Sequence, residues 1–313
     1  MTGEPAPSLI RARELTKRFG SFVAVDAVDF DVAPGEAFGF LGPNGAGKTS
    51  TMRMIGCVSP VTDGELSVLG MDPRTDGPAI RARIGVVPQQ DTLDNELTVA
   101  DNLMIYGRYF GLSRAEARRR GAELLDFVQL SDRAGDQVEP LSGGMKRRLS
   151  IARSLINEPA LMLLDEPTTG LDPQARHLVW DRLWRLKQRG VTLVLTTHYI
   201  DEAEQLCDRL VVMDKATIVA AGSPRDLIAR YSTREVTEMR FETGVDTTTM
   251  AAIFDGLASR VEHLPDRVLL YSDDGEATAV AVHDRGLRPE TVLVRRSTLE
   301  DVFLRLTGRS LVE

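Results

Sequence analysis

The 313-residue sequence has few cysteines and no long hydrophobic run. Its only cysteines are Cys57 and Cys207, too few for a disulfide framework or a cysteine-rich zinc site. The apolar runs, such as residues 191–195, have the length of strands and fall short of the roughly 20 residues that span a bilayer. Residues 1–20 lack the apolar core of a signal peptide. We therefore expect a protein of a reducing compartment that reaches a membrane only through a partner.

Positively charged residues are also fewer than negatively charged ones. Lysine and arginine together number 38, against 46 aspartate and glutamate residues, which gives a formal net charge of −8 at pH 7. The phosphate backbone of a nucleic acid attracts a basic surface, and so does the anionic face of a membrane. The charge balance argues against both kinds of binder, and no nucleic-acid partner is expected.

Strand-like and helix-like patterns alternate over the first 230 or so residues. A continuous apolar stretch at 37–41 precedes a glycine-rich loop, and a helix is predicted from Lys48 onward. Buried strands are predicted again at 160–166 and at the segment VTLVLTTH, with an amphipathic helix between them. This order predicts an α/β fold with a largely parallel sheet. Residues 8–231 are expected to form this domain, with a helical subdomain at about 91–150.

The pattern changes near Tyr231. Short segments that alternate apolar and polar residues, as strands do, lie at 234–243, 267–274, 278–284 and 291–296. A helix is predicted near 248–257, and a final amphipathic helix at 298–308. Residues 232–313 are therefore predicted to form a small α+β domain.

Residues 42–49 read GPNGAGKT and fit the pattern G-x-x-x-x-G-K-[ST] between an apolar strand and a helix. Glycines let backbone N–H groups turn toward a phosphate, and the start of the helix adds a favourable dipole. Lys48 is placed to reach the β- and γ-phosphates, and the Thr49 hydroxyl to bind Mg²⁺. An ordinary glycine turn is the alternative, but the strand and helix around the loop favour a nucleotide site. The candidate ATP-binding residues are Gly42, Pro43, Asn44, Gly45, Ala46, Gly47, Lys48, Thr49 and Ser50.

An acidic pair ends the predicted strand LMLLDE. Asp165 is placed to hold Mg²⁺ through water, as P-loop chemistry requires. The next residue, Glu166, points differently and can polarise an attacking water as a general base. Two carboxylates at a solvated strand end are a common alternative, and the upstream P-loop favours the catalytic interpretation.

Three further side chains are candidates for catalysis or nucleotide contact. His198 ends the strand VTLVLTTH at the sheet edge where α/β folds bind ligands, and it can donate to a γ-phosphate, although lone histidines are mostly structural. Gln89 can contact Mg²⁺ or the attacking water; the alternatives are a solvated loop glutamine or the neighbouring Gln90. Phe19 in KRFG can stack on an adenine ring, or it is an aromatic residue of a strand edge.

A second glycine-rich helix start, LSGGMKRR, occupies residues 141–148. Ser142, Gly143 and Gly144 precede a helix whose N-terminus is another candidate anion site, and the serine hydroxyl can contact a phosphate. One nucleotide needs only one such cradle. Either the chain folds the two glycine-rich segments together, or two chains meet head to tail and each completes the nucleotide site of the other.

In this order, GPNGAGKT, PQQ, LSGGM, LMLLDEP, TGLDP and TTH resemble the motifs of the ATP-binding cassette (ABC) ATPases over about residues 8–230. The resemblance implies a RecA-like core with an antiparallel β subdomain and a helical subdomain. It also implies ATP and Mg²⁺ as cofactors, and a head-to-tail dimer in which residues 142–144 contact the ATP of the partner. Asp172 in TGLD is expected to communicate across that interface. Phe19 stands where many ABC proteins have tyrosine, and Met145 replaces the common glutamine.

Other segments, TTGLDPQARHLVWDRL, EAEQLCDRL and LEDVFLRLTGR, resemble bacterial exporter ATPases of the daunorubicin-resistance and nodulation-factor types. This resemblance implies an ATPase bound peripherally at the cytoplasmic side of the membrane to a separate polytopic permease. Its second ATP-binding subunit is expected to be an identical chain. Drug or multidrug efflux is the leading expectation, and export of a lipo-oligosaccharide, glycolipid or polysaccharide is the alternative. A non-transport ABC ATPase of translation or DNA repair is disfavoured, because the sequence has one set of motifs without zinc cysteines or long coiled-coil insertions.

Overall fold

The computed structural model describes residues 8–242 and 251–308. The chain divides into two compact units, Met1–Ala221 and Gly222–Glu313. The helix α8 (Pro224–Tyr231) belongs to the second unit, because it packs against α11 (Leu299–Thr307) there. The predicted boundary between residues 231 and 232 therefore differs from the division that the structure makes.

The first unit is built on a six-stranded sheet in the order β5-β6-β7-β3-β8-β9. The bounds of its strands are β3 (Ala37–Leu41), β5 (Ile84–Val87), β6 (Leu161–Asp165), β7 (Thr192–Thr197), β8 (Arg209–Asp214) and β9 (Thr217–Gly222). The pairs from β5 to β8 are parallel, and every residue of β3, β6 and β7 is buried. The predicted α/β fold with a largely parallel sheet is confirmed. The loops that follow β3, β6 and β7 share one sheet edge, the edge where α/β folds bind ligands.

A smaller antiparallel sheet in the order β2-β1-β4 completes the core of this unit. It is formed by β1 (Ile10–Phe19), β2 (Phe22–Val32) and β4 (Asp63–Val68). Apolar residues from both sheets share one core, in which the ring of Phe30 meets the ring of Phe40 edge to face at 5.1 Å. This sheet is the antiparallel β subdomain that the ABC resemblance implies.

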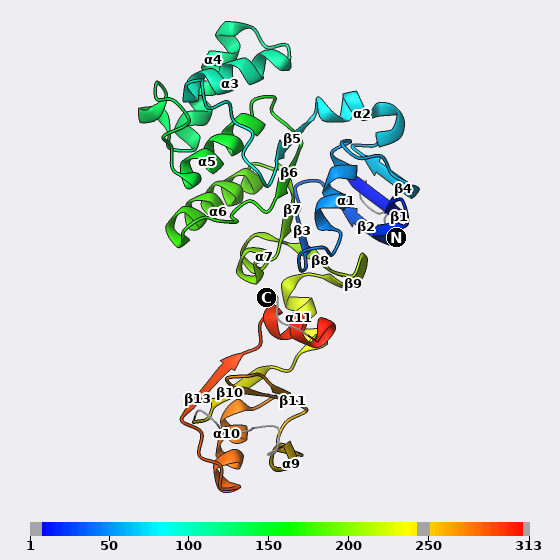
Figure 1. The fold of residues 1–313 in the computed structure, drawn as a ribbon, viewed down its shortest axis with the longest axis vertical. Coiled ribbons are helices and arrows are strands. Elements are labelled where there is room, and N and C mark those ends of the chain that lie inside the picture. Colours follow the sequence, from blue (N-terminus) through cyan, green and yellow to red (C-terminus); the bar gives the residue numbers. More distant parts are fainter. Residues whose placement is uncertain (1–7, 243–250, 309–313) are drawn as a thin grey trace, which may run out of the picture. The chain divides into compact units, whose positions relative to one another are not determined.

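Helices cover both faces of the six-stranded sheet. They are α1 (Lys48–Ile55), α2 (Pro73–Arg81), α6 (Pro173–Gln188) and α7 (Ile200–Leu206). Figure 1 shows α1 on one side of this sheet and α6 with α7 on the other. Met52, Met54 and Ile55 of α1 are buried in the shared core, so the glycine loop before α1 is anchored at its end.

The predicted helical subdomain, at about residues 91–150, is a separate helical layer in Figure 1. It contains α3 (Val99–Tyr109), α4 (Arg114–Phe127), the short 3-10 helix η1 (Ser131–Arg133) and most of α5 (Gly143–Ser154). Each α-helix begins at a hydroxyl cap, because Thr98, Ser113 and Ser142 each accept a hydrogen bond from the N–H three residues later. Leucine and valine side chains from these helices and from the segments that connect them form a hydrophobic cluster of their own.

The second unit contains a four-stranded antiparallel sheet in the order β11-β12-β10-β13. Its elements after α8 are β10 (Glu235–Arg240), α9 (Ala251–Phe254), β11 (Arg260–His263), β12 (Val268–Ser272), α10 (Gly275–Asp284), β13 (Thr291–Arg296) and α11. The succession β-α-β-β-α-β with this strand order is the split βαβ arrangement. The predicted α+β class of this region agrees with it.

The predicted strand at 278–284 is wrong. These residues lie in α10, whose first turn is capped by Asp274 through a 2.9 Å hydrogen bond from the Ala277 N–H. Alternating alanine and valine resemble a strand pattern, but the burial has the spacing of a helix. Thr278 and Val282 are buried, while Val280 between them is 62% exposed. Of the predicted helix at 248–257, residues 248–250 lie outside the described residues, and α9 follows at 251–254.

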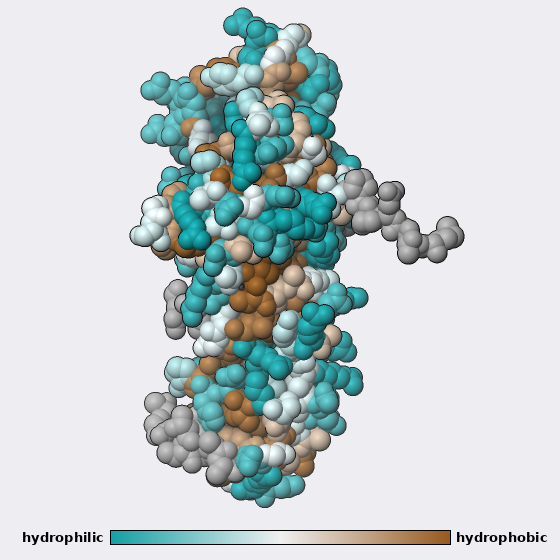
Figure 2. All heavy atoms as spheres, turned by 90° about the vertical axis from the view of Figure 1, so that its right-hand side faces the viewer, coloured by the Kyte–Doolittle hydropathy of each residue, from teal (hydrophilic) through white to brown (hydrophobic). Residues whose placement is uncertain are grey.

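Hydrophilic residues dominate the face of the molecule shown in Figure 2, and hydrophobic residues form smaller patches on it. Large hydrophobic side chains that are exposed come from several elements, namely Phe19, Phe22, Val58, Val86, Tyr109, Trp184, Val219, Val280, Val292 and Leu293. Across residues 8–242 and 251–308, no helix is both long and apolar enough to cross a bilayer.

Candidate nucleotide site

A cavity of about 190 Å³ opens at the start of α1. Its lining consists of Phe22, Ala24, Asn44, Gly45, Ala46, Gly47, Lys48, Thr49, Ser50, Gln89 and Glu166. The structure thus brings the predicted phosphate loop together with two of the predicted catalytic residues. These segments are far apart in the sequence and meet because they follow parallel strands of one sheet, in which β5 adjoins β6 and only β7 separates β6 from β3.

Two glycines of the loop are required by their surroundings. A Cβ atom on Gly42 would lie 2.3 Å from the carbonyl oxygen of Met213. Gly47 has a φ of +105°, which L side chains rarely adopt, and a Cβ there would lie 2.5 Å from the carbonyl oxygen of Ala24. Glycine at these positions therefore allows the loop to pack closely against β2 and β8.

Lys48 is buried within the loop, with 4% of its surface exposed. Its Nζ donates to the carbonyl oxygens of Gly42 at 2.7 Å and Pro43 at 3.0 Å, and lies 4.0 Å from Glu166 Oε1. Burial lowers the pKa of Lys48, while the charges of Glu166 and Asp165 act in the opposite direction. An ammonium group held at the centre of a glycine loop matches the charge of a phosphate group.

Asp165 lies beside the hydroxyl of the predicted magnesium ligand. Thr49 Oγ1 donates to Asp165 Oδ1 at 3.2 Å, and Thr196 Oγ1 donates to the same oxygen at 2.5 Å. No group of three or more histidine, cysteine, aspartate or glutamate side chains in the described ranges could hold a metal ion by itself. One carboxylate and one hydroxyl fit Mg²⁺, which binds few protein ligands and takes the others from phosphate and water.

The Glu166 carboxylate is 6% exposed and has three polar neighbours besides Lys48. Its Oε2 accepts hydrogen bonds from Gln89 Nε2 at 2.9 Å and Thr169 Oγ1 at 3.1 Å. His198 Nδ1 lies 3.1 Å from Oε1. All three predicted catalytic residues therefore meet at one carboxylate.

The second glycine-rich segment lies elsewhere, since residues 142–144 are not among those that line the cavity. Ser142 caps α5 by accepting a 3.3 Å hydrogen bond from the Met145 N–H. A Cβ on Gly144 would lie 2.8 Å from Ala175 Cβ, and Asp172 caps α6 by accepting a 2.9 Å hydrogen bond from the Ala175 N–H. The second cradle and Asp172 are thus neighbours on this chain.

Phe19 is 53% exposed at the end of β1, where the Lys17 ammonium lies 4.9 Å from the centre of its ring. It is not among the residues that line the cavity, whereas its strand partner Phe22 is. Phe22, Thr169 and Thr196 were not predicted as site residues. Threonines near strand ends are common, so the sequence does not distinguish these two, and their hydrogen-bond partners are known only from the fold.

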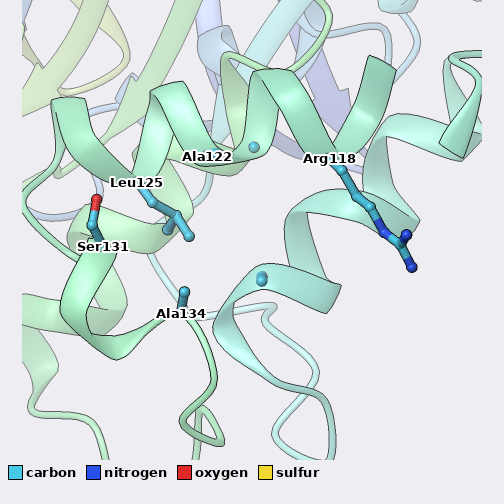
Figure 3. A pocket seen from close by; sticks show the side chains of 7 residues that line it. Arg118, Ala122, Leu125, Ser131 and Ala134 are labelled. Carbon is cyan, nitrogen blue, oxygen red and sulfur yellow. The ribbon is translucent and has the colours of Figure 1, made fainter. Parts of the chain in front are cut away.

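A second hollow, of about 180 Å³, lies among α3, α4 and the segment that contains η1. Its lining is mostly apolar and consists of Ala100, Arg118, Gly121, Ala122, Leu125, Ser131 and Ala134. Figure 3 shows that Leu125, Ser131 and Ala134 gather on one side of it, with Arg118 at the other end. None of the nucleotide-site residues contributes to this hollow.

Comparison with known proteins identifies the class. Residues 25–169 match the ABC transporter family. A solved ATP-binding subunit of an ABC transporter is 31% identical with a TM-score of 0.65, and the match covers 72% of this chain and 93% of that one. A dimeric post-hydrolysis state of an ATP-binding cassette, bound to ADP and Pi, is 28% identical with a TM-score of 0.63, over 68% and 98%. The chain belongs to the ABC transporter ATP-binding proteins: it binds ATP and is an ATPase coupled to transport.

Its particular relatives extend to the second unit. Residues 247–308 match the C-terminal domain of nodulation factor export protein NodI. The Nod factor export ATP-binding protein I of Cupriavidus metallidurans is 44% identical over 304 residues, which cover 97% of this chain and 99% of that protein. The protein of the same name from Rhizobium meliloti is 47% identical over 304 residues, which cover 96% and 89%.

Proposed function

We propose that this chain is the ATP-hydrolysing subunit of a bacterial exporter whose substrate is a lipo-oligosaccharide of the nodulation-factor class. The similarity to Nod factor export ATP-binding proteins carries the proposal, because it extends over nearly the whole chain and includes the C-terminal region. Drug efflux, the leading expectation from the sequence, has no support among these relatives. The alternative expectation of oligosaccharide export takes its place.

In this proposal, residues 42–50 hold the phosphates of ATP. Lys48 places its ammonium group against the β- and γ-phosphates. Thr49 and Asp165, already joined by a hydrogen bond, are the ligands for Mg²⁺, and Gln89 is a third ligand from the neighbouring segment. When bound, Mg²⁺ neutralises charge on the transferred phosphate. Phe19 is proposed to stack on the adenine ring.

Glu166 is the proposed general base, which takes a proton from the attacking water. Gln89 donates to one oxygen of its carboxylate and so restrains its orientation, while His198 Nδ1 lies 3.1 Å from the other oxygen. His198 is also proposed to donate to the γ-phosphate. The support for these roles is that all three side chains meet beside the buried Lys48.

The active form is proposed to be a homodimer in which Ser142, Gly143 and Gly144 of one chain complete the ATP site of the other. Two observations support this arrangement: these residues do not line the cavity of their own chain, and a similar solved cassette is dimeric with ADP and Pi bound. Asp172 adjoins Gly144 through Ala175, so we propose that it communicates between the two sites.

The dimer is proposed to work at the cytoplasmic side of the membrane with a separate polytopic permease. Closure of the dimer around two ATP molecules would pull on the permease, and hydrolysis would release it. The permease mainly selects the exported molecule, and this chain supplies the ATP hydrolysis that drives export.

The test is a pull-down of tagged Glu166→Gln protein with ATP from detergent-solubilised cells, with partners identified by mass spectrometry. We expect a polytopic membrane protein in equal amount, and deletion of the gene for either protein should stop secretion of the lipo-oligosaccharide. Wild-type protein should restore secretion, and the matched control Lys48→Ala should not. Ribosomal or DNA-bound partners would contradict the transport proposal. A membrane partner whose loss changes only drug sensitivity would contradict the substrate class.

A further inference from the structure

Arg147 of α5 is buried, with 9% of its surface exposed, and its guanidinium bonds to backbone carbonyl groups. Its Nε donates to the Pro167 oxygen at 2.7 Å. Its Nη2 donates to the oxygens of Asp165 at 2.8 Å and Glu166 at 2.9 Å, and its Nη1 bonds to the oxygen of Pro88. One side chain thus ties α5 to the end of β6 and to the segment after β5.

These carbonyl groups lie on both sides of the proposed catalytic contact. Pro88 precedes Gln89, and Asp165 and Pro167 flank Glu166 in the chain. The side chains of Gln89 and Glu166 meet at 2.9 Å. Arg147 therefore holds the backbone of both residues that form this hydrogen bond.

The backbone of Glu166 needs such support. Its φ of 46° lies in the left-handed region, which is unfavourable for a residue with a side chain and persists only when the surroundings enforce it. The Glu166 N–H donates to both the carbonyl oxygen and the hydroxyl of Thr196. On its other side, the Glu166 carbonyl oxygen accepts from Arg147. Loss of the guanidinium would release one of these two restraints.

The chemistry of arginine suits this position. Its planar fork has five N–H donors, enough to reach several carbonyl oxygens at once, and neither lysine nor glutamine has that geometry. Within the described part of the chain, Arg147 forms no ion pair within 4.0 Å, so its partners are neutral. Burial lowers its pKa to about 10, while Glu202 and Asp165 act in the opposite direction. A buried cation with neutral partners is costly for folding, and a role in hydrolysis accounts for it.

We propose that Arg147 is a positioning residue, which holds Glu166 and Gln89 in the geometry for hydrolysis and ties that geometry to α5. Because α5 begins directly after Ser142, contact of its N-terminus with the ATP of the partner is transmitted to Glu166 of the same chain. This inference rests on the proposed general base and the proposed dimer, and it is independent of what is exported.

The neighbouring Arg148 provides a matched control. It lies on the same helix, burial also lowers its pKa, and it too donates to backbone carbonyls, those of Val128 at 2.8 Å and Gln129 at 3.3 Å. These carbonyls belong to the end of the helical layer and not to β6. Substitution of either arginine therefore removes a partly buried guanidinium from α5, and only one substitution touches Glu166.

The experiment compares Arg147→Gln with Arg148→Gln in the full-length protein, by steady-state ATP hydrolysis and by equilibrium binding of ATP. We expect Arg147→Gln to lower kcat by about 10- to 100-fold, the scale of a misplacement of about 1 Å at a reacting centre. KM and ATP affinity should change by less than about twofold, as expected when only transition-state stabilisation is lost. Arg148→Gln should lower thermal stability by about as much as Arg147→Gln does, while its kcat stays within about twofold of the wild-type value.

A double-mutant cycle decides whether Arg147 acts through Glu166. The residual rate of Glu166→Gln should not fall further when Arg147→Gln is added. Multiplicative losses, an equal loss of kcat in Arg148→Gln, or a loss of ATP affinity in place of kcat would overturn the proposal. If Arg147→Gln does not fold, Arg147→Lys takes its place in the same cycle. A wild-type rate in Glu166→Gln would overturn the general base itself, whereas an inactive Glu166→Gln beside a fully active Arg147→Gln would overturn only the role of Arg147.

Discussion

A single buried ammonium group carries the positive charge of the predicted phosphate loop. Lys48 is enclosed by the carbonyl groups of Gly42 and Pro43, and its pKa is lowered chiefly by burial. The hydrogen bonds of this ammonium group become stronger when a phosphate replaces its neutral carbonyl partners, because charged hydrogen bonds are about twice as strong as neutral ones. Its chemical effect is therefore expected in ATP binding more than in folding.

The first prediction concerns this residue. Lys48→Ala removes a charged donor worth about 1.5–3 kcal/mol, so we expect ATP affinity to fall by about 10- to 100-fold. Equilibrium titration with a fluorescent ATP analogue measures the change. Lys187→Ala serves as control, because Lys187 pairs with Asp208 at 2.6 Å and does not line the cavity. Equal ATP affinity in the two variants would contradict a role for Lys48 in phosphate binding.

At the scale of a helix, the start of α5 contains two glycines with different surroundings. A Cβ at Gly144 would lie 2.8 Å from Ala175 Cβ on α6, whereas a Cβ at Gly143 would meet nothing within 4 Å. We expect Gly144→Ala to lower the free energy of unfolding by about 1–3 kcal/mol through this overlap. Gly143→Ala should leave it unchanged or raise it by up to about 1 kcal/mol, because alanine favours a helix. Denaturant unfolding of both variants without nucleotide is the measurement, and equal stabilities would contradict the close approach of α5 to α6.

In the second unit, Asp301 joins α11 to the sheet. It is 1% exposed and accepts hydrogen bonds from both Nη atoms of Arg295, from the Tyr271 hydroxyl at 3.0 Å and from the Thr298 N–H at 2.8 Å. Burial by itself would raise the pKa of Asp301, but these hydrogen bonds prevail and lower it. The ionised carboxylate is therefore the form that stabilises this unit.

The sign of the pH dependence follows from that lowered pKa. The contribution of Asp301 is fully present above its unfolded pKa of about 3.9 and is lost as pH falls through the lower folded value. We expect hydrogen exchange in β12 and α11, corrected for intrinsic rates, to accelerate at about pH 3 relative to pH 6. Asp301→Asn should destabilise the unit by about 3–5 kcal/mol and flatten this dependence, since it breaks a buried ion pair. The exposed Asp284→Asn is the control, and the same pH profile in both variants would contradict the assignment.

At the scale of the whole molecule, the proposed dimer depends on ATP. Glu166→Gln should form a stable dimer with saturating ATP, because in the proposed arrangement ATP would be bound between the chains and would not be hydrolysed. Light scattering after size-exclusion chromatography measures the mass, and the same protein without ATP should be monomeric. Adding Lys48→Ala should abolish the dimer. A monomeric mass for Glu166→Gln at saturating ATP would contradict the head-to-tail arrangement.

Prediction from sequence worked where structure is local. The span 37–41 was predicted as a strand and Lys48 as the start of a helix, and both bounds are those of β3 and α1. It failed at 278–284, where small apolar residues fit a strand or a helix and packing on the sheet decided for α10. The positioning role proposed for Arg147 could not be predicted from the sequence, because the carbonyl groups that accept its hydrogen bonds come from two distant segments.

The sequence by itself determined the phosphate-binding chemistry proposed for this protein, since a glycine loop, its lysine and its threonine are expected to act through backbone conformation and side-chain type within a few residues. Only the tertiary structure decided what surrounds Glu166. Gln89, His198 and Arg147 reach that residue because β5, β6 and β7 lie side by side and α5 packs against β5. The same packing places the second cradle outside the cavity of its own chain, because contacts between distant segments depend on the whole core.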